Sequence, residues 1–349
     1  ILANQGAAWA DAGQLASAHA CARRALGLDA NCPPAHNLLG RVRLLEDRPG
    51  VARDYLERAV AADATYFDAW LNLGNAAAAL GERERAHQAY RRAQALHPAH
   101  PGPWANLGQM QRDAGQLEPA RASFEEALRR DGRHRSSLQG ARQLSPAWEL
   151  VLQGRRLSLA RSAAEDAEFI AACQQDAAFM RLYHARIDRQ TPLERLRERL
   201  SRQRAEPVFR AGGCQWLITQ RRQGRPVGLV NLADIDFHEA RAELVVGVPG
   251  TEDRLHGYAL EACLLVLDLA FTRLRFNKIT AVVYDYNAKS IHDIQQLGFR
   301  QESHLRQHLW DEAQGRYIDL LGFGMTAQDF QSDPRLARLS RRLLTAAAV

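Results

Sequence analysis

The sequence predicts two domains of different fold class: an all-α helical-repeat domain in the first half and an α/β domain with a mostly antiparallel sheet in the second. Three observations support this prediction. Small residues recur every 34 positions through the first half, apolar segments typical of strands alternate with helical segments in the second half, and 349 residues exceed what one hydrophobic core usually supports. With 46% hydrophobic and 25% charged residues, the chain has a globular composition.

The repeat is visible as columns of glycine and alanine. One column holds Gly6, Gly40, Gly74 and Gly108, and two others hold Ala18, Ala52, Ala86 and Ala120, and Ala25, Ala59, Ala93 and Ala127. A period of 34 is that of the tetratricopeptide repeat, and the third and fourth units resemble this family at most of its positions. The matching residues are Trp70, Leu73, Gly74, Ala86, Tyr90, Ala93 and Pro98, followed by Trp104, Leu107, Gly108, Ala120, Phe124 and Ala127.

In such a unit two helices form a hairpin, whose small residues allow a close approach while the large ones fill the space beside the crossing. One hairpin cannot bury its apolar face alone, so four stacked units are expected to share a core and to present a concave surface. Residues 135–144 are predicted to form a polar capping helix that ends at Ser145-Pro146. The repeat domain is therefore expected to cover residues 1–145.

An asparagine stands just before the Leu-Gly pair in two full units, at Asn72 and Asn106, whereas Leu38 interrupts the series. The pattern resembles the asparagine ladder of O-linked GlcNAc transferase, whose side-chain amides bind the backbone of an extended polypeptide. An amide suits this task because it offers both a donor and an acceptor to a peptide group. The resemblance implies a protein or peptide partner on the concave surface. The alternative is that both asparagines are merely solvated helix residues.

From residue 155 the pattern changes to alternating strands and helices. Predicted strands cover residues 156–160, 215–220, 226–234, 243–248, 278–284, 301–310 and 315–325. Predicted helices cover residues 163–182, 257–273 and 290–297, with a further amphipathic helix that begins at Thr191-Pro192. This domain is expected to span residues 146–330, followed by a C-terminal helical tail at residues 331–349.

Three segments of the second half resemble the GNAT superfamily of acetyltransferases, and more narrowly its RimJ/RimL-like branch. The first ends in Arg254-Leu-His-Gly257-Tyr-Ala259, which fits the family's R/Q-x-x-G-x-G/A loop. The second is Asn287-Ala-Lys-Ser290 after a strand, and the third is Leu297-Gly298-Phe299. The resemblance covers residues 155–327 and implies acetyl-CoA (coenzyme A) as the cofactor, without a metal.

The resemblance implies that the Arg254–Ala259 loop binds the pyrophosphate of CoA. Backbone N–H groups at a helix N-terminus suit an anion, Gly257 lets the chain come close, and Arg254 adds a charge. A helix cap at Asn287 or Ser290 is compatible with a cofactor role. The expected cofactor residues are Val246, Val248, Arg254, Leu255, His256, Gly257, Tyr258, Ala259, Asn287 and Ser290.

Acetyl transfer to an amine needs a base, because a lysine amine has a pKa near ~10.4 and an α-amine one near ~8. By resemblance to the histone acetyltransferase branch, Glu243 on the strand that enters the loop is the predicted general base. The alternative is an exposed strand residue paired with Arg241. A backbone N–H of Val245, Val246 or Val248 is the predicted donor to the oxyanion.

Many GNAT enzymes protonate the departing thiolate with a tyrosine at the position of Ile294. Because this chain lacks that tyrosine, Ser290 is the predicted acid, with Tyr284, Tyr286 and His292 as alternatives. A thiolate also leaves tolerably without an acid, so the substitution does not imply an inactive enzyme.

These patterns favour an N-acetyltransferase whose protein or peptide substrate is recruited by the repeats. A small-molecule N-acetyltransferase for an amino sugar nucleotide or polyamine, with repeats used for assembly, and a non-catalytic acetyl-CoA-binding adaptor are the alternatives.

Composition adds expectations about location. Five scattered cysteines without a C-x-x-C pair indicate a reducing compartment, and the sequence contains neither a membrane-spanning run nor a signal peptide pattern. A cytoplasmic location is expected, with neither membrane nor nucleic acid as a partner, despite the formal charge of +6. Because the first residue is not Met, the sequence is expected to be a fragment of a longer protein.

Overall fold

A computed structural model describes residues 1–183, 191–311 and 314–344. Its contacts divide the chain into two compact units, Ile1–Ala141 and Arg142–Val349. Within the described ranges, no helix is long and apolar enough to cross a membrane.

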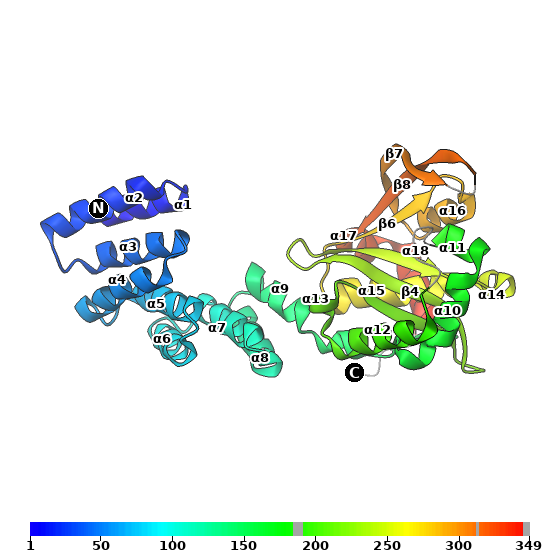
Figure 1. Cartoon of the computed structure of the whole chain (residues 1–349), viewed down its shortest axis with the longest axis horizontal. Helices are drawn as coiled ribbons and strands as arrows, with labels where there is room; N and C mark the ends of the chain where they lie inside the picture. Colours follow the sequence, from blue (N-terminus) through cyan, green and yellow to red (C-terminus); the bar gives the residue numbers. More distant parts are fainter. Residues whose placement is uncertain (184–190, 312–313, 345–349) are drawn as a thin grey trace. The chain divides into compact units, whose positions relative to one another are not determined.

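The first unit consists of consecutive helix pairs, as the period of the sequence predicts (Figure 1). Its helices are α1 (Leu2–Asp11), α2 (Leu15–Leu28), α3 (Pro33–Leu45), α4 (Pro49–Ala62), α5 (Phe67–Ala79), α6 (Arg83–Leu96), α7 (Gly102–Asp113), α8 (Leu117–Arg130) and α9 (Arg135–Gln143). The last two residues of α9, Arg142 and Gln143, belong to the second unit. From α1 to α8 each helix packs against the next one along the chain, and α1, α3, α5 and α7 also contact one another in order. The prediction of an all-α helical-repeat domain is confirmed.

The small-residue columns lie where the paired helices cross. A Cβ atom on Gly74 would come within 2.4 Å of the Tyr90 ring, and one on Gly108 within 2.9 Å of the Phe124 ring. The alanines Ala86 and Ala120 are completely buried in the same hairpins. A larger side chain would therefore separate the helices, which is the physical reason for the columns.

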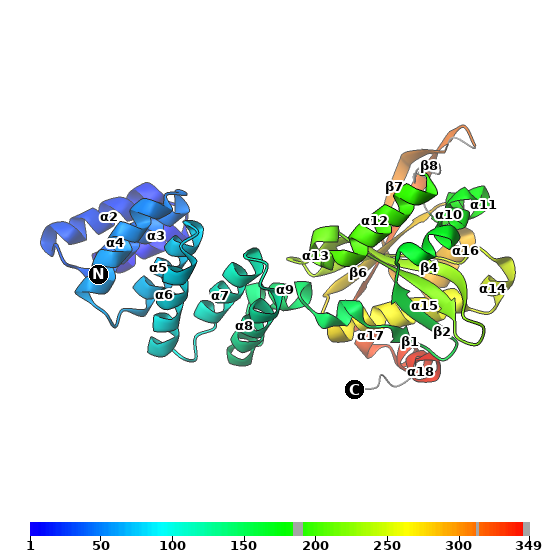
Figure 2. The ribbon, with the colours of Figure 1, turned by 60° about the horizontal axis from the view of Figure 1, so that its bottom comes forward.

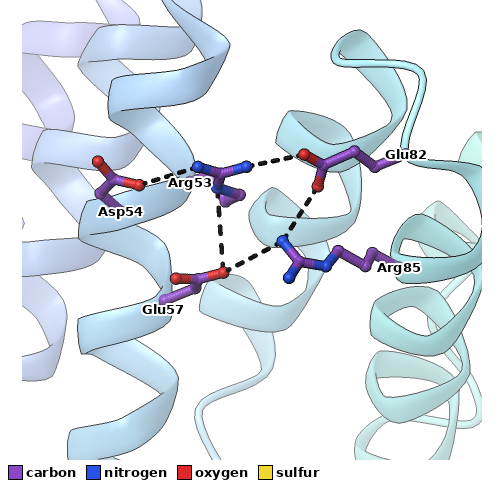
Figure 3. A network of polar contacts seen from close by, with 5 residues as sticks. All are labelled: Arg53, Asp54, Glu57, Glu82 and Arg85. Atoms are coloured by element: carbon purple, nitrogen blue, oxygen red, sulfur yellow. Dashed lines mark hydrogen bonds and ion pairs between the residues drawn. The ribbon is translucent and has the colours of Figure 1, made fainter.

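An ion-pair network joins the second and third repeats (Figure 3). Arg53 on α4 donates to Glu82 at 2.7 Å and to Asp54 at 3.4 Å. Arg85 lies 3.4 Å from Glu82 and 3.9 Å from Glu57, which closes the network. Because exposed ion pairs each contribute little to stability, the apolar packing between helices remains the main source of stability.

The second unit is built on one eight-stranded sheet. Its strands are β1 (Leu152–Gln153), β2 (Leu157–Arg161), β3 (Cys214–Gln220), β4 (Arg225–Asp236), β5 (Arg241–Gly247), β6 (Lys278–Tyr284), β7 (Arg300–Asp311) and β8 (Arg316–Thr326). The strand order is β1-β2-β3-β4-β5-β6-β8-β7, and all neighbours are antiparallel except β5 and β6. The predicted α/β fold with a mostly antiparallel sheet is confirmed.

Helices pack on both faces of this sheet (Figure 2). On one face, α15 (Tyr258–Asp268), α17 (Ala327–Ser332) and α18 (Pro334–Leu343) contribute Leu264, Phe330 and Leu336 to the main core. On the other face, α10 (Ala167–Gln175), α11 (Ala177–Tyr183) and α12 (Leu193–Ala205) form a second cluster. The remaining helices are η1 (Pro146–Glu149), η2 (Ala164–Asp166), α13 (Val208–Ala211), α14 (Thr251–Leu255), the π-helical η3 (Leu269–Arg273) and α16 (Ala288–Gln296).

Two segments differ in extent or surroundings from what the sequence predicts. The helix predicted for residues 163–182 is divided, because Asp176 takes an extended conformation and its Oδ1 accepts the Phe179 N–H at 3.0 Å. Asp176 thereby caps a new helix, α11, a position that Asp favours. Within the tail expected at residues 331–349, α18 is helical, and its Leu336 and Leu343 lie in the main core. Residues 345–349 of that tail lie outside the described residues.

Candidate active site

Strands β5 and β6 are paired only at their beginnings. The paired residues are Arg241 with Lys278, Ala242 with Ile279, and Glu243 with Thr280. Beyond these pairs, within the described residues, each strand pairs only with its other neighbour, β4 or β8. The sheet therefore opens between residues 244–247 and residues 281–284, a region called the strand split below.

The register identifies which backbone groups of β5 face the strand split. The Lys278 N–H and the Thr280 hydroxyl donate to the carbonyls of Ala240 and Ala242, each at 3.2 Å. Backbone groups of alternate strand residues point to the same side, so Leu244 and Val246 also face β6. Because Val246 lies beyond the last pair with β6, its N–H points into the split. By the same alternation the Val245 N–H points away from β6, and Val248 lies beyond the end of β5.

The helix α15 begins with Gly257 as its N-cap. Gly257 has φ 69°, a conformation that L-residues rarely adopt, and its carbonyl accepts the Glu261 N–H at 3.3 Å. The N–H groups of Tyr258, Ala259 and Leu260 occupy the first turn, where a helix supplies no acceptor of its own. Together with the helix dipole, these three groups form a site that suits an anion.

Arg254 lies on α14 and donates to the loop that precedes it. Its Nε donates to the Val248 carbonyl at 2.7 Å, and its Nη2 donates to the Pro249 carbonyl at 2.9 Å. Val248 itself follows the end of β5. Arg254 therefore fixes the path of the chain between β5 and α15, in addition to placing a positive charge near the helix N-terminus. On the same short helix, Asp253 accepts two hydrogen bonds from Arg225, at 2.7 and 3.0 Å.

The remaining loop residues have separate surroundings. The exposed His256 ring stacks on the buried Tyr258 ring with centroids 5.4 Å apart, and its Nδ1 lies 2.7 Å from the Glu252 carbonyl. Ala259 packs against the main core. The backbone of Leu255 ends α14, while its side chain lies outside the described residues.

Asn287 caps α16, as the compatible alternative from sequence anticipated. Its Oδ1 accepts the Ser290 N–H at 3.2 Å, and the side chain is 8% exposed. Ser290 is half-buried in the first turn of the same helix. Ile294, at the position of the expected tyrosine, packs against the main core. The alternative acid Tyr286 donates its hydroxyl to the Arg181 carbonyl at 2.8 Å.

Glu243 stands on β5 at the last pair before the strand split. Its neighbours Ala242 and Leu244 point into the main core, so Glu243 points to the opposite face of the sheet. Arg241, the partner suggested by the alternative interpretation, contacts Asp236 at 3.5 Å. Burial, and secondarily the charge of Asp234, raises the pKa of the Glu243 carboxyl. A raised pKa makes its carboxylate a stronger base than an ordinary glutamate.

In the repeats, each of the two predicted asparagines bonds to another asparagine of the preceding hairpin. Asn72 donates its Nδ2 to Asn37 Oδ1 at 2.9 Å, and Asn106 donates its Nδ2 to Asn75 Oδ1 at 2.7 Å. Asn75 also accepts the Tyr90 hydroxyl at 3.0 Å. The prediction from sequence missed Asn37 and Asn75, because they do not occupy the repeat position of Asn72 and Asn106.

Sequence reasoning also missed Arg156 and Glu261. Arg156 lies at the turn before β2 and its Nε donates to Glu261 on α15 at 2.9 Å. The available signal was Glu261 itself, an acidic residue in the first turn of a predicted helix and directly before six apolar residues, 262–267.

Comparison with known proteins agrees with both units. Residues 156–300 match a family model described as the acetyltransferase (GNAT) domain, and residues 67–110 and 102–134 match two models of the tetratricopeptide repeat. An SPbeta prophage-derived uncharacterized N-acetyltransferase of Bacillus subtilis is 37% identical over 75 residues, which are 22% of this chain and 41% of the relative. The spermidine N(1)-acetyltransferase of Vibrio cholerae is 30% identical over 103 residues, which are 30% of this chain and 58% of the relative.

These matches span about half the length of the curated relatives. A solved structure of the spermidine N-acetyltransferase from Vibrio cholerae in complex with CoA and spermine is 22% identical, with a TM-score of 0.45, over 51% of this chain and 99% of that chain. The family models identify tetratricopeptide repeats within residues 67–134 and a GNAT acetyltransferase domain at residues 156–300.

Proposed function

We propose that this chain is an acetyl-CoA-dependent N-acetyltransferase that transfers an acetyl group to a primary amine. The observation that supports it most is the strand split, because β5 leads from it into the N-terminus of α15 within the segment that matches the GNAT family model. The split exposes backbone donors to a thioester arm, and the helix terminus offers N–H groups to a diphosphate.

The residues around α15 fit CoA. The N–H groups of Tyr258, Ala259 and Leu260 would bind its pyrophosphate, and the Val246 N–H would meet the arm that enters the strand split. The Asn287 Oδ1 already accepts the Ser290 N–H, so the Asn287 Nδ2 group is the part available to the cofactor. When bound, the cofactor supplies an activated acetyl thioester.

Glu243 takes the proton from the incoming ammonium group, so that the neutral amine can attack the thioester carbonyl. The raised pKa of the Glu243 carboxyl favours this role, because the base must hold the proton once it has accepted it. The Val246 N–H would stabilise negative charge on the carbonyl oxygen of a bound acetyl group. Ser290 is the proposed proton donor to the departing sulfur.

The acceptor is proposed to be a protein or peptide bound by the repeats, which match a repeat family. Each inter-repeat bond uses one N–H of Asn72 or Asn106, and an amide also has a second N–H and a carbonyl oxygen for a peptide group. The second candidate is a polyamine, because Glu243 and Asp234 place negative charge near the proposed site of proton transfer. The name of the Vibrio cholerae relative, a spermidine acetyltransferase, supports this candidate.

Incubation of the full chain with labelled acetyl-CoA, proteins and small amines tests the activity. Mass spectrometry is expected to find acetylated amines that are absent when Glu243→Gln protein replaces the wild type. Labelled protein products support recruitment by the repeats, whereas labelled polyamine alone supports the second candidate. CoA that fails to bind the wild-type chain in calorimetry would contradict the proposed activity.

The double variant Asn72→Ala, Asn106→Ala tests the role of the repeats. Each lost contact with a peptide backbone is worth about 1 kcal/mol, so KM for a protein acceptor should rise roughly tenfold or more. KM for a small amine should not change. Gln88→Ala, an exposed position on α6, is the matched control. Equal KM values for the protein acceptor in the double variant and the control would assign the repeats to assembly.

A further inference from the structure

The carboxylate of Glu261 is completely buried beneath the beginning of α15. Its Oε1 accepts the backbone N–H groups of Arg156 and Leu157, at 2.7 and 3.2 Å, and its Oε2 accepts the Arg156 Nε at 2.9 Å. A Cβ atom on Gly154 would come within 2.3 Å of Oε1, so the turn before β2 closely encloses the carboxylate. A buried carboxylate is tolerated only when it is paired and hydrogen-bonded, and Glu261 meets both conditions.

The Arg156 guanidinium also contacts the chain that precedes α15. Its Nη1 donates to the His256 carbonyl at 2.5 Å, and its Nη2 contacts the Gly257 carbonyl at 3.4 Å. The guanidinium carbon lies 5.4 Å from the centroid of the Tyr258 ring. Arg156 therefore links Glu261 to His256 and Gly257, the two residues that directly precede α15.

These contacts set the direction of a backbone donor. Because the peptide bond is planar and trans, the Tyr258 N–H points away from the Gly257 carbonyl. The Gly257 carbonyl faces Arg156, so the Tyr258 N–H faces the opposite side. Ala259 and Leu260 follow it in the first turn with N–H groups that have no acceptor within the helix.

Charge gives Arg156 a second effect. A carboxylate in the first turn of a helix lies where an anionic ligand would bind, and Glu261 without a partner would repel a diphosphate. Arg156 compensates this charge through its ion pair. Arginine suits this role because the N–H groups of its planar guanidinium can contact a carboxylate and carbonyl oxygens at the same time.

We propose that Arg156 is a positioning residue for the CoA diphosphate. It neutralises Glu261 and holds the His256 and Gly257 carbonyls, so that the N–H groups of the first turn of α15 face the diphosphate. This inference rests on the proposed function, because it concerns the same cofactor site.

Calorimetry on the full chain with CoA tests it, using Arg156→Met and the matched control Arg155→Met, which changes an exposed neighbour. Arg156→Met should raise Kd for CoA roughly tenfold or more, because charge-assisted hydrogen bonds are lost. Turnover of S-acetyl-N-acetylcysteamine, an acetyl donor without phosphates, and kcat at saturating acetyl-CoA should stay within about twofold of wild type. The control should bind CoA like the wild type.

Arg156→Lys is the second variant, since it keeps the charge that balances Glu261 if Arg156→Met does not fold. Lysine lacks the planar guanidinium with several N–H donors, so Kd for CoA should rise roughly threefold or more. Turnover of the phosphate-free donor should be retained. A Kd equal to that of the wild type, or an equal loss with both acetyl donors, would overturn the inference. Failure of the wild-type chain itself to bind CoA would instead reject the proposed function.

Discussion

Asn72 and Asn106 in the repeats donate hydrogen bonds to asparagines of neighbouring hairpins, whereas Arg142 and Glu261 in the acetyltransferase unit bond largely to backbone groups. The repeat partners are 35 and 31 positions apart, close to one repeat. Arg142 instead reaches carbonyls 95 to 133 positions away, at Phe237, Leu274 and Arg275.

The difference follows from how the two units are built. A repeat contacts mainly its neighbours, so a polar residue finds its partner at about the same offset in each unit. A single sheet with crossing connections brings together segments distant in sequence, and its polar residues satisfy backbone groups that the sheet and helices leave unpaired. We therefore expect substitutions at the polar anchors of the acetyltransferase unit to cost more than substitutions in the repeats.

The largest effect is expected for Arg142→Ala. Its guanidinium donates at 2.8 to 3.0 Å to three carbonyls, and it is 7% exposed. Loss of these charge-assisted bonds should lower the free energy of unfolding of the acetyltransferase unit by about 3 kcal/mol or more. Chemical denaturation of the full chain measures this value, with Arg338→Ala at an exposed position of α18 as the control. If Arg142→Ala lowers the free energy of unfolding no more than Arg338→Ala does, the expected difference between the two units is contradicted.

Glu243→Gln should lower kcat about 100-fold or more and leave Kd for CoA unchanged, because an amide keeps the shape of the carboxylate but cannot accept the proton. In the wild type, kcat/KM should rise with pH through the raised pKa of the Glu243 carboxyl. Asp234→Asn should move this rise to lower pH, because the Asp234 charge contributes to the raised pKa. A rate within about twofold of wild type from roughly pH 6 to 9 would assign the proton transfer to another group.

Glu243→Gln should also change how the stability of the folded chain depends on pH. The folded-state pKa of Glu243 is raised, so its favourable contribution is fully present below the ordinary glutamate pKa, near ~4.3, and is lost as pH rises through the folded-state pKa. Glu243→Gln removes this titration. The variant should therefore gain stability relative to wild type on going from acidic to neutral pH, as measured by denaturation at both pH values.

Gly257→Asp should weaken CoA binding by about tenfold or more in calorimetry, because it sets a carboxylate at the site proposed for the diphosphate. Gly257 has φ 69°, so the substitution also strains the backbone. Gly224→Asp is the matched control, since Gly224 has φ 66° in the turn between β3 and β4. Equal CoA affinity in the two variants would remove the α15 terminus from the proposed cofactor site.

The smallest effect is expected in the repeats, at Asp47. In three hairpins the turn residue is a glycine with φ from 75° to 77°, whereas Asp47 occupies the equivalent place with φ 56°. Asp47→Gly relieves this strain but increases the conformational freedom of the unfolded chain. The free energy of unfolding should therefore rise by at most about 1 kcal/mol. Thermal unfolding measures it. The reciprocal change Gly81→Asp should lose a similar amount, and a gain there would contradict the argument.

Much of the fold was predictable because it depends on local patterns. The period of Gly74 and Gly108 defines the hairpins, and the alternation of apolar residues locates β3 to β8 to within a few positions. Asn287 was recognisable as a helix cap from its place before α16. The division of the helix at Asp176 was missed, because its capping role depends on which of several polar residues ends α10.

The sequence by itself determined the two fold classes, the family resemblances and the candidate segments of the site, because repeat periods and short motifs are properties of neighbouring residues. Only the tertiary structure showed that the Val246 N–H, and not the Val245 N–H, faces β6, because this depends on strand register. It alone joined Arg156 to Glu261, which are 105 positions apart. Such contacts arise when distant elements pack together and bury their polar groups, and a partner at that distance leaves no periodic trace in the chain.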